Sequence, residues 1–351
     1  MRVLVTGHDG YIGTVLVPML RARGHEVVGL DSFLYEACSF GAPPAPVDAL
    51  RMDVRDVTVD HLRGYDGVLH LAAISNDPVG DLNPDCTLDL NHRGTMHLAD
   101  CAKTAGVDRF VFSSSCSLYG SGGQAMLDES ADFNPLTPYG ESKVLSERAL
   151  SALADDEFSP TYLRNATAYG VSPRLRGDLV VNNLVGFAFT TGEVFMKSDG
   201  TPWRPLAHIE DISRAFVAVL EADRSLVHDE AFNVGVTTEN YRVSEVAAIV
   251  EEIVPDSRVV LAEAAGPDLR DYRVDCSKLE ETLSAYRPVW NVRKGAEELL
   301  AAYREVGLSE ELFHSSSLSR IRHVKQMIAE GRLDDMLRWR ADVAPTTVVV
   351  E

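Results

Sequence analysis

Short apolar runs alternate with longer amphipathic segments through the first half of the chain, and this alternation restricts the fold more than any other feature. Four runs lack the polar alternation of half-exposed strands and are expected to be buried: residues 2–6, 25–31, 67–73 and 109–115. Between them, residues 14–24 and 93–106 have helical spacing and end in a glycine suited to a helix C-terminus. This alternation predicts an α/β fold with a parallel, doubly wound sheet.

The regular alternation stops after residues 160–170 (PTYLRNATAYG), and a segment rich in polar and turn residues follows. We therefore expect one domain over residues 1–170, with its sheet completed by about 204–235. A smaller lobe over 171–340 and a loose or edge-forming tail over 341–351 would follow. Within the lobe, helical spacing places four apolar residues on one face of a helix docked on the body: Leu318, Ile321, Val324 and Ile328.

Charge and composition exclude several classes of protein. The formal net charge of -20 argues against general affinity for nucleic acid or an anionic membrane. No apolar stretch reaches the length of a membrane span, and the chain starts directly in a strand-like run, so we expect neither a membrane segment nor a secretory signal. The 5 cysteines are scattered without CxxC spacing, which is typical of reduced thiols in a cytoplasmic protein without a zinc site.

A glycine-rich stretch, TGHDGYIG, joins the first strand to the first helix and contains Gly7, Gly10 and Gly13. Glycines let the backbone approach a pyrophosphate, whose charge is favoured by the N–H groups at a helix start. Asp31 ends the second strand, where a carboxylate accepts ribose hydroxyls and repels a 2′-phosphate. The pattern favours NAD over NADP, although Asp31 in a plain turn is the alternative.

Two further segments follow strand candidates and are placed to contact a dinucleotide. Asp53, followed by Val54, is positioned to reach the adenine, or else is a solvated loop residue. Leu71, Ala72 and Ala73 end the fourth strand with small or apolar side chains that would let a cofactor lie close. A simple packing role for these alanines is the alternative.

Ser115, Tyr139 and Lys143 carry a hydroxyl, a phenol and an amine at a spacing typical of redox enzymes. Tyr139 and Lys143 lie at i and i+4 in a predicted helix after Pro138, so they share one face. A neighbouring ammonium and a cationic nicotinamide would both lower the pKa of the tyrosine, allowing a phenolate to act as base. Ser115, at the end of the fourth buried run, would hydrogen-bond the same substrate hydroxyl. Surface polar residues at chance spacing are the alternative.

These motifs together resemble the extended short-chain dehydrogenase/reductases of the NAD-dependent nucleotide-sugar epimerase/dehydratase family. The resemblance covers about residues 1–300 and rests on TGHDGYIG, LDS, HLAA, NHRGT, SSSCSLYG, YGESK and LRNATAYG. It implies a Rossmann-type domain with a smaller C-terminal substrate-binding lobe, and a homodimer formed through the helices that carry Asn91 and Tyr139. It makes Tyr139 the base, Lys143 its partner and ribose ligand, and Ser115 the third catalytic residue. The implied residues of the NAD site are Gly7, Gly10, Tyr11, Ile12, Gly13, Asp31, Asp53, Val54, Leu71, Ala72, Ala73, Asn91, Tyr139 and Lys143, of which Asn91 helps to position Lys143 through water.

The resemblance also implies a nucleoside-diphosphate sugar as substrate, whose phosphates need arginines. Arg204 matches the family's diphosphate contact, and Arg270 lies near a second such position, with Arg273 as its alternative. Asn182 matches an asparagine that meets the substrate, with Asn183 as its alternative. Other residues implied to contact substrate are Asn165, and Ser75 and Asn76 of a segment that lines the sugar pocket or only forms a polar turn.

The two residues that follow Ser115 differ from those of the family's dehydratases and decarboxylases. Where those relatives carry carboxylates, this chain has Cys116 and Ser117, which argues against ordinary 4,6-elimination or glucuronate decarboxylation. Cys116 is either an unusual acid or base or a small packing residue. The sequence therefore predicts a nucleotide-sugar 4-epimerase acting through a transient 4-keto sugar. The alternatives are an oxidoreductase or unusual dehydratase using Cys116, and a non-catalytic NAD-binding sensor, against which the intact Ser-Tyr-Lys set argues.

Overall fold

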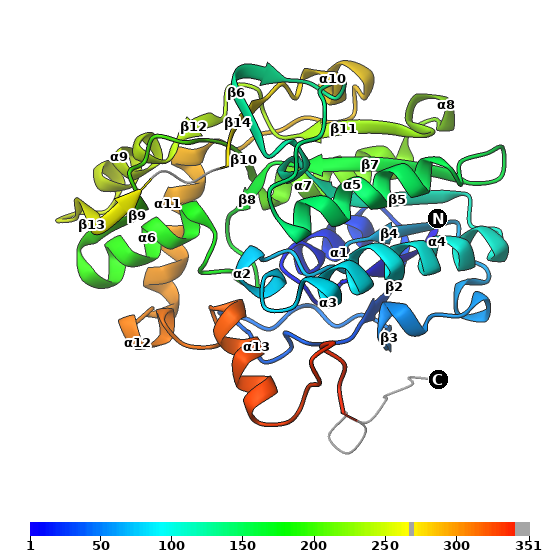
Figure 1. Cartoon of the computed structure of the whole chain (residues 1–351), viewed down its shortest axis with the longest axis horizontal. Helices are drawn as coiled ribbons and strands as arrows, with labels where there is room; N and C mark the ends of the chain where they lie inside the picture. Colours follow the sequence, from blue (N-terminus) through cyan, green and yellow to red (C-terminus); the bar gives the residue numbers. More distant parts are fainter. Residues whose placement is uncertain (267–269, 341–351) are drawn as a thin grey trace.

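The computed structural model describes residues 1–266 and 270–340, and its centre is a sheet of parallel strands (Figure 1). The strand order is β11-β7-β5-β4-β1-β2-β3. The bounds are β1 (Arg2–Thr6), β2 (Glu26–Asp31), β3 (Ala49–Arg51), β4 (Gly67–His70), β5 (Arg109–Ser115), β7 (Ser159–Asn165) and β11 (Glu230–Val234). The order changes direction between β1 and β4, and ligands bind at the carboxyl ends of strands beside such a switch point. The predicted doubly wound α/β fold is confirmed.

Helices cover both faces of this sheet because alternate residues of each strand point to opposite sides. Val3 and Val5 join a buried cluster with α1 (Gly13–Ala22) and α7 (Ile209–Glu221). Leu4 joins the opposite cluster. That second cluster contains residues of η1 (Val54–Asp56), η2 (Val59–Leu62), α4 (Gly94–Ala105) and α5 (Pro138–Ser151). Apolar packing on both faces explains why the strands read as continuous hydrophobic runs.

The second lobe is built largely from the segments that follow β7. A three-stranded sheet has the order β12-β10-β8, and β9 pairs with β13. Its elements are β8 (Thr167–Tyr169), α6 (Val180–Thr191), β9 (Glu193–Ser198), β10 (Trp203–His208), β12 (Asn240–Arg242), α9 (Val243–Ile253), β13 (Arg258–Gly266) and α11 (Val292–Val306). Helices α6, α9 and α11 share one buried cluster. Of the range 204–235, β11 completes the central sheet, whereas β10 pairs with β8 and β12 instead.

Shorter elements complete the fold. Strands β6 (Ser121–Leu127) and β14 (Asp271–Val274) pair with each other. The others are α2 (Asp77–Gly80), α3 (Pro84–Leu88), the π-helical turn η3 (Asp89–Arg93), the 3₁₀ turn η4 (Cys116–Tyr119), α8 (Arg224–Val227), α10 (Ser277–Thr282) and α12 (Glu310–Phe313). Among the described residues, the helices are all too short or too polar to cross a bilayer.

The last helix of the described residues, α13 (Arg320–Ala329), returns to the first domain and packs beside α2 (Figure 1). Its Val324 joins a buried cluster with Ile74 and Val79, as the predicted docking requires. The predicted face is wrong at its end, because Ile328 is exposed and Met327 is buried instead. The helix begins at Arg320, and its buried face consists of Arg320, His323, Val324 and Met327. Leu318 therefore lies in the segment before the helix. The predicted tail, 341–351, lies outside the described residues.

Candidate active site

A cavity of about 1330 Å³ opens at the carboxyl ends of the central strands. Each of five strands contributes a residue at or just after its end, namely Gly7, Asp31, Leu71, Ser115 and Asn165. Further walls come from residues 74–78, from the start of α5, from the second lobe and from residues 318–322. The cavity therefore lies where a doubly wound sheet is expected to bind its ligand.

The glycine loop forms a cradle in which side chains would not fit. Gly7 has a φ of +71°, and a Cβ added to it would lie 2.8 Å from the backbone nitrogen of Ala72. A Cβ on Gly13 would lie 2.4 Å from the carbonyl oxygen of Gly7. Tyr11 and Ile12 of the same loop also line the cavity, at the start of α1. A backbone this close-packed at a helix start fits the pyrophosphate of a dinucleotide.

Asp31 is held at the cavity wall by the backbone around it. Its Oδ2 accepts a hydrogen bond from the amide of Asp9 at 3.1 Å, and its Oδ1 accepts one from Phe33 at 2.8 Å. Burial raises the pKa of Asp31, and these amide hydrogen bonds act in the opposite direction. Two backbone amides therefore fix the orientation of this carboxylate at the cavity wall.

Asp53 lines the same cavity together with Val54, Leu71, Ala72 and Ala73. The Nη2 atom of Arg55 lies 2.6 Å from Oδ2 of Asp53. Burial alone would raise the pKa of Asp53, but the hydrogen bonds from Arg55 outweigh it and lower the pKa. Its carboxylate is thus already paired within the protein, while its position still suits an adenine contact.

Asn91 does not line the described cavity, so any part it has in the cofactor site is a positioning one. It is fully buried, behind the described wall of the cavity. Its Oδ1 accepts a hydrogen bond from the amide of Ile74 at 2.7 Å, and its Nδ2 donates to the carbonyl of Ile74 at 2.9 Å. Asn91 therefore fixes the loop after β4 and positions cavity residues without touching the ligand space.

Tyr139 and Lys143 share one face of α5, as predicted, and both line the cavity with Ser115. The helix starts where it does because Thr137 caps it, accepting a hydrogen bond from Gly140, and Pro138 occupies its first turn. The Nζ atom of Lys143 donates to the carbonyl of Ser113 at 2.7 Å and lies 5.5 Å from the centre of the Tyr139 ring. One strand end and one helix start thus bring the three groups together.

Burial shifts the protonation equilibria of Tyr139 and Lys143. Burial raises the pKa of Tyr139 to about 12, and its hydrogen bond with Ser115 only partly opposes that shift. Burial also lowers the pKa of Lys143 to about 7. Among the protein's own groups, burial therefore decides the pKa of Tyr139, and the predicted lowering of that pKa rests on the positive charge of a bound nicotinamide.

Cys116 does not line the described cavity. It is fully buried, and its thiol donates to the carbonyl of Arg164 at 3.1 Å. Burial raises the pKa of this thiol far above its usual range. It packs with Leu118 and Tyr119, whereas the neighbouring Ser117 lines the cavity. The catalytic role considered for Cys116 is therefore wrong, and its role is packing.

The predicted substrate residues separate into two groups. Six line the cavity: Ser75, Asn76, Asn165, Asn183, Arg204 and Arg270. Asn182 is fully buried and bonds the amide of Gly170 at 3.0 Å and the hydroxyl of Tyr11 at 3.1 Å. Arg273 stacks on Trp203, 5.0 Å from the ring centre, and lies outside the described cavity wall. Between the stated alternatives, the structure favours Asn183 and Arg270.

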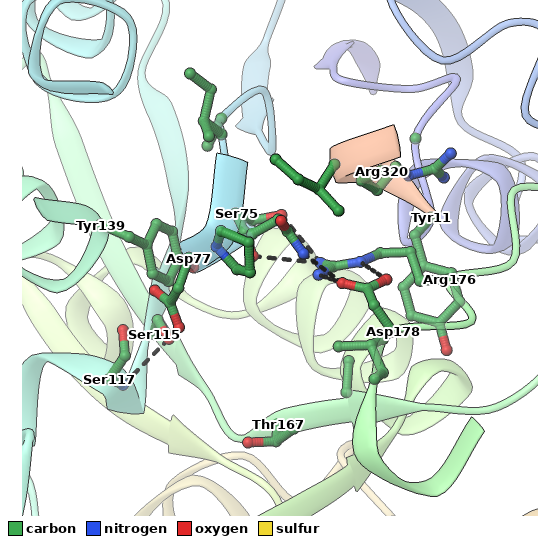
Figure 2. Close-up of a pocket in the computed structure, with 18 of the residues that line it drawn as sticks. Tyr11, Ser75, Asp77, Ser115, Ser117, Tyr139, Thr167, Arg176, Asp178 and Arg320 are labelled. Carbon is green, nitrogen blue, oxygen red and sulfur yellow. Dashed lines mark hydrogen bonds and ion pairs between the residues drawn. The ribbon is translucent and has the colours of Figure 1, made fainter. Parts of the chain in front are cut away.

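Sequence reasoning missed several polar residues of the cavity (Figure 2). Arg176 and Asp178 form an ion pair of 2.7 Å, and Arg176 also bonds Ser75. Asp77 pairs with Arg270 at 2.5 Å. Asp77, unlike the Arg176–Asp178 pair, belongs to the segment of residues 75–78 that the sequence had already suggested as a lining of the sugar pocket or as a polar turn.

The chain is similar to one family model and to several known proteins. Residues 3–235 match the NAD dependent epimerase/dehydratase family. The chain is 30% identical over 268 residues to a UDP-glucose 4-epimerase of Corynebacterium glutamicum, covering 72% of this chain and 80% of that protein. It is 26% identical over 324 residues to UDP-glucuronic acid decarboxylase 1 of Arabidopsis thaliana, covering 89% and 72%. The solved structure of MoeE5 in complex with UDP-glucuronic acid and NAD has a TM-score of 0.75 at 29% identity, covering 87% and 99%.

The chain therefore belongs to the NAD-dependent epimerase/dehydratase family of extended short-chain dehydrogenase/reductases. Its cofactor is NAD, and the glycine cradle and Asp31 are the residues that fit it. It is an enzyme of nucleotide-sugar chemistry.

Proposed function

We propose that the protein is a nucleotide-sugar 4-epimerase that acts through a transient 4-keto sugar. The observation that carries this proposal is the meeting of Ser115, Tyr139 and Lys143 in one cavity with the glycine cradle. UDP-glucose 4-epimerases among the relatives support it. A decarboxylase is also among them, so the experiment below separates epimerisation from other outcomes of the same ketone.

NAD, when bound, supplies the hydride acceptor and donor for the sugar carbon. The Tyr139 oxygen takes the proton of the substrate hydroxyl and later returns it, while Ser115 Oγ hydrogen-bonds the same hydroxyl. Lys143 is anchored through the Ser113 carbonyl and stabilises the phenolate. Epimerisation requires the sugar ring to present its other face before the proton returns from Tyr139.

Cations inside the cavity account for binding of an anionic substrate by a chain of net charge -20. Arg204 is buried and lines the cavity together with Arg270. Backbone carbonyls hold the guanidinium of Arg204 in place, since Nη1 donates to the carbonyl of Trp203 at 2.7 Å and to that of Arg270. We assign these arginines to the diphosphate, because short charge-assisted contacts are the strong ones.

The proposal is tested by incubating the NAD-loaded protein with UDP-, dTDP- and GDP-sugars in D₂O and identifying the products by NMR. Native protein should give the C4 epimer of one sugar. Tyr139→Phe should bind NAD normally and turn over about 10²–10⁴-fold more slowly, because only the proton-transfer group is lost. Tyr65→Phe, which removes a phenol outside the cavity wall, is the matched control. A Tyr139→Phe protein with native turnover would contradict the assignment.

A further inference from the structure

Asp77 brings a carboxylate to the cavity wall beside the catalytic tyrosine. It is the first residue of α2, whose N-terminus is capped by Asn76 through a 3.0 Å hydrogen bond from Val79. Asp77, Ser115, Ser117 and Tyr139 all line the cavity. Figure 2 shows Asp77 between Tyr139 and the Arg176–Asp178 pair, on the side of Ser115 and Ser117. A carboxylate therefore lies in the same part of the cavity as the hydroxyl groups of Ser115, Ser117 and Tyr139.

The two oxygens of Asp77 are in different situations. Oδ2 pairs with Nη1 of Arg270 at 2.5 Å, which fixes the orientation of the side chain. Oδ1 is buried and has no hydrogen-bond partner among the residues that the structure describes. The Oγ atom of Ser117 is also buried and has no hydrogen-bond partner among the described residues. Leaving a buried polar atom unpaired costs about 1–3 kcal/mol, so these two oxygens point to partners on a ligand.

Asp77 supplies a carboxylate that the residues after Ser115 do not. Ser117 stands where the resemblance places a glutamate in dehydratases and decarboxylases. Because Asp77 comes from the loop after β4 and Ser117 from the turn after β5, only the fold brings them to the same cavity. Asp77 is therefore a candidate base for a carbon atom next to C4 of the sugar.

We propose that Asp77 is a second acid–base residue, which exchanges the proton on a carbon next to the ketone of the 4-keto sugar. The inference rests on the proposed function, since the ketone is formed there. The C–H bond at C3 or C5 breaks, and its proton passes to Oδ1 of Asp77. The electron pair becomes a C=C bond to C4, and the ketone becomes an enolate oxygen. Return of a proton to carbon reverses the step, which involves no net oxidation or reduction.

The other residues of the cavity fit this step. Tyr139 holds a proton once it has taken one from the substrate hydroxyl, so Tyr139 and Ser115 donate hydrogen bonds to the enolate oxygen. Arg270 is a positioning residue, since it holds one carboxylate oxygen and leaves the other toward the cavity. The proposal therefore gives the enzyme an activity at a ring carbon adjacent to the one that is oxidised.

The test supplies the ketone directly, so that hydride transfer is not needed. The NAD-loaded protein is incubated in D₂O with the dTDP and UDP forms of 4-keto-6-deoxyglucose, and NMR follows deuterium at C3 and C5. Native protein should incorporate deuterium at one of these carbons at least about 100-fold faster than the protein-free solution. Asp77→Asn should lose that acceleration, whereas Asp77→Glu should keep part of it. Asp85→Asn, which removes an exposed carboxylate nearby, should match native protein.

The outcomes separate this inference from the proposed function. Native protein that epimerises a nucleotide sugar at C4 but does not accelerate exchange would overturn the role of Asp77 alone. Exchange as fast in Asp77→Asn as in native protein would overturn it too. Exchange that depends on Asp77, without any C4 epimer from the sugar panel, would support Asp77 and contradict the 4-epimerase. Calorimetric NAD binding by Asp77→Asn shows that this variant is folded.

Discussion

Helix α5, which carries the catalytic tyrosine and lysine, is held on the sheet by a buried ion pair between Glu147 and Arg164. The two side chains are 5% and 6% exposed, with Nη2 of Arg164 2.7 Å from Oε2 of Glu147. Arg164 also donates to Tyr119 at 3.0 Å, and Ser114 of β5 donates to Glu147. Glu147 lies one turn after Lys143, so this pair fixes the part of α5 that faces the cavity.

We predict that Glu147→Gln lowers the free energy of unfolding by about 3–5 kcal/mol, because it leaves a buried guanidinium without its counter-charge. The double variant Glu147→Leu/Arg164→Met should be considerably more stable than the single one, since no buried charge remains. Urea denaturation followed by circular dichroism measures both. Glu221→Gln, which disrupts a more exposed pair with Arg23, is the control and should have a much smaller effect.

The reasoning fails if Glu147→Gln changes the free energy of unfolding by less than about 1 kcal/mol, the size of a surface pair. It also fails if the double variant is no more stable than Glu147→Gln, because removal of the buried guanidinium charge would then bring no relief.

Three further predictions concern the ligands and the buried lysine. Calorimetric titration should show that NAD binds at least about tenfold more tightly than NADP, because the carboxylate of Asp31 repels a 2′-phosphate; equal affinities would remove Asp31 from that role. Arg204→Ala should weaken binding of the preferred nucleoside diphosphate by about 2 kcal/mol and leave NAD affinity unchanged, and unchanged diphosphate affinity would transfer the role to Arg270. Burial lowers the pKa of Lys143 to about 7, whereas an unfolded lysine titrates near about 10.4, so between these values the unfolded chain holds the extra proton. The stability of cofactor-free native protein relative to Lys143→Met should therefore rise with pH through this window in urea denaturation, and a flat or falling difference would contradict the buried, neutral amine.

The parts of the site that could be predicted from the sequence depend on local geometry. Gly7 and Gly13 lie in one loop, and Tyr139 and Lys143 lie one turn apart, so their relation hardly depends on the rest of the fold. Asp31 was predictable because it ends a strand of a recognisable unit.

The parts that could not be predicted depend on which way a side chain turns once the lobes pack. Asn182 and Asn183 differ by about 100° around α6, and only packing decides that Asn183 lines the cavity. Cys116 and Ser117 likewise face opposite sides of one turn. Asp77 reaches the cavity from a loop remote in sequence from Ser117, so no spacing rule could connect them.

The central claim is that the hydrogen removed from C4 of the sugar is the one returned to it. The most direct measurement uses the preferred nucleotide sugar carrying deuterium at C4, incubated with the NAD-loaded protein in ordinary water and followed by NMR. The account predicts a product with inverted configuration at C4 that still carries the deuterium there. Loss of that deuterium to solvent, or a product with unchanged C4 configuration, would contradict the account.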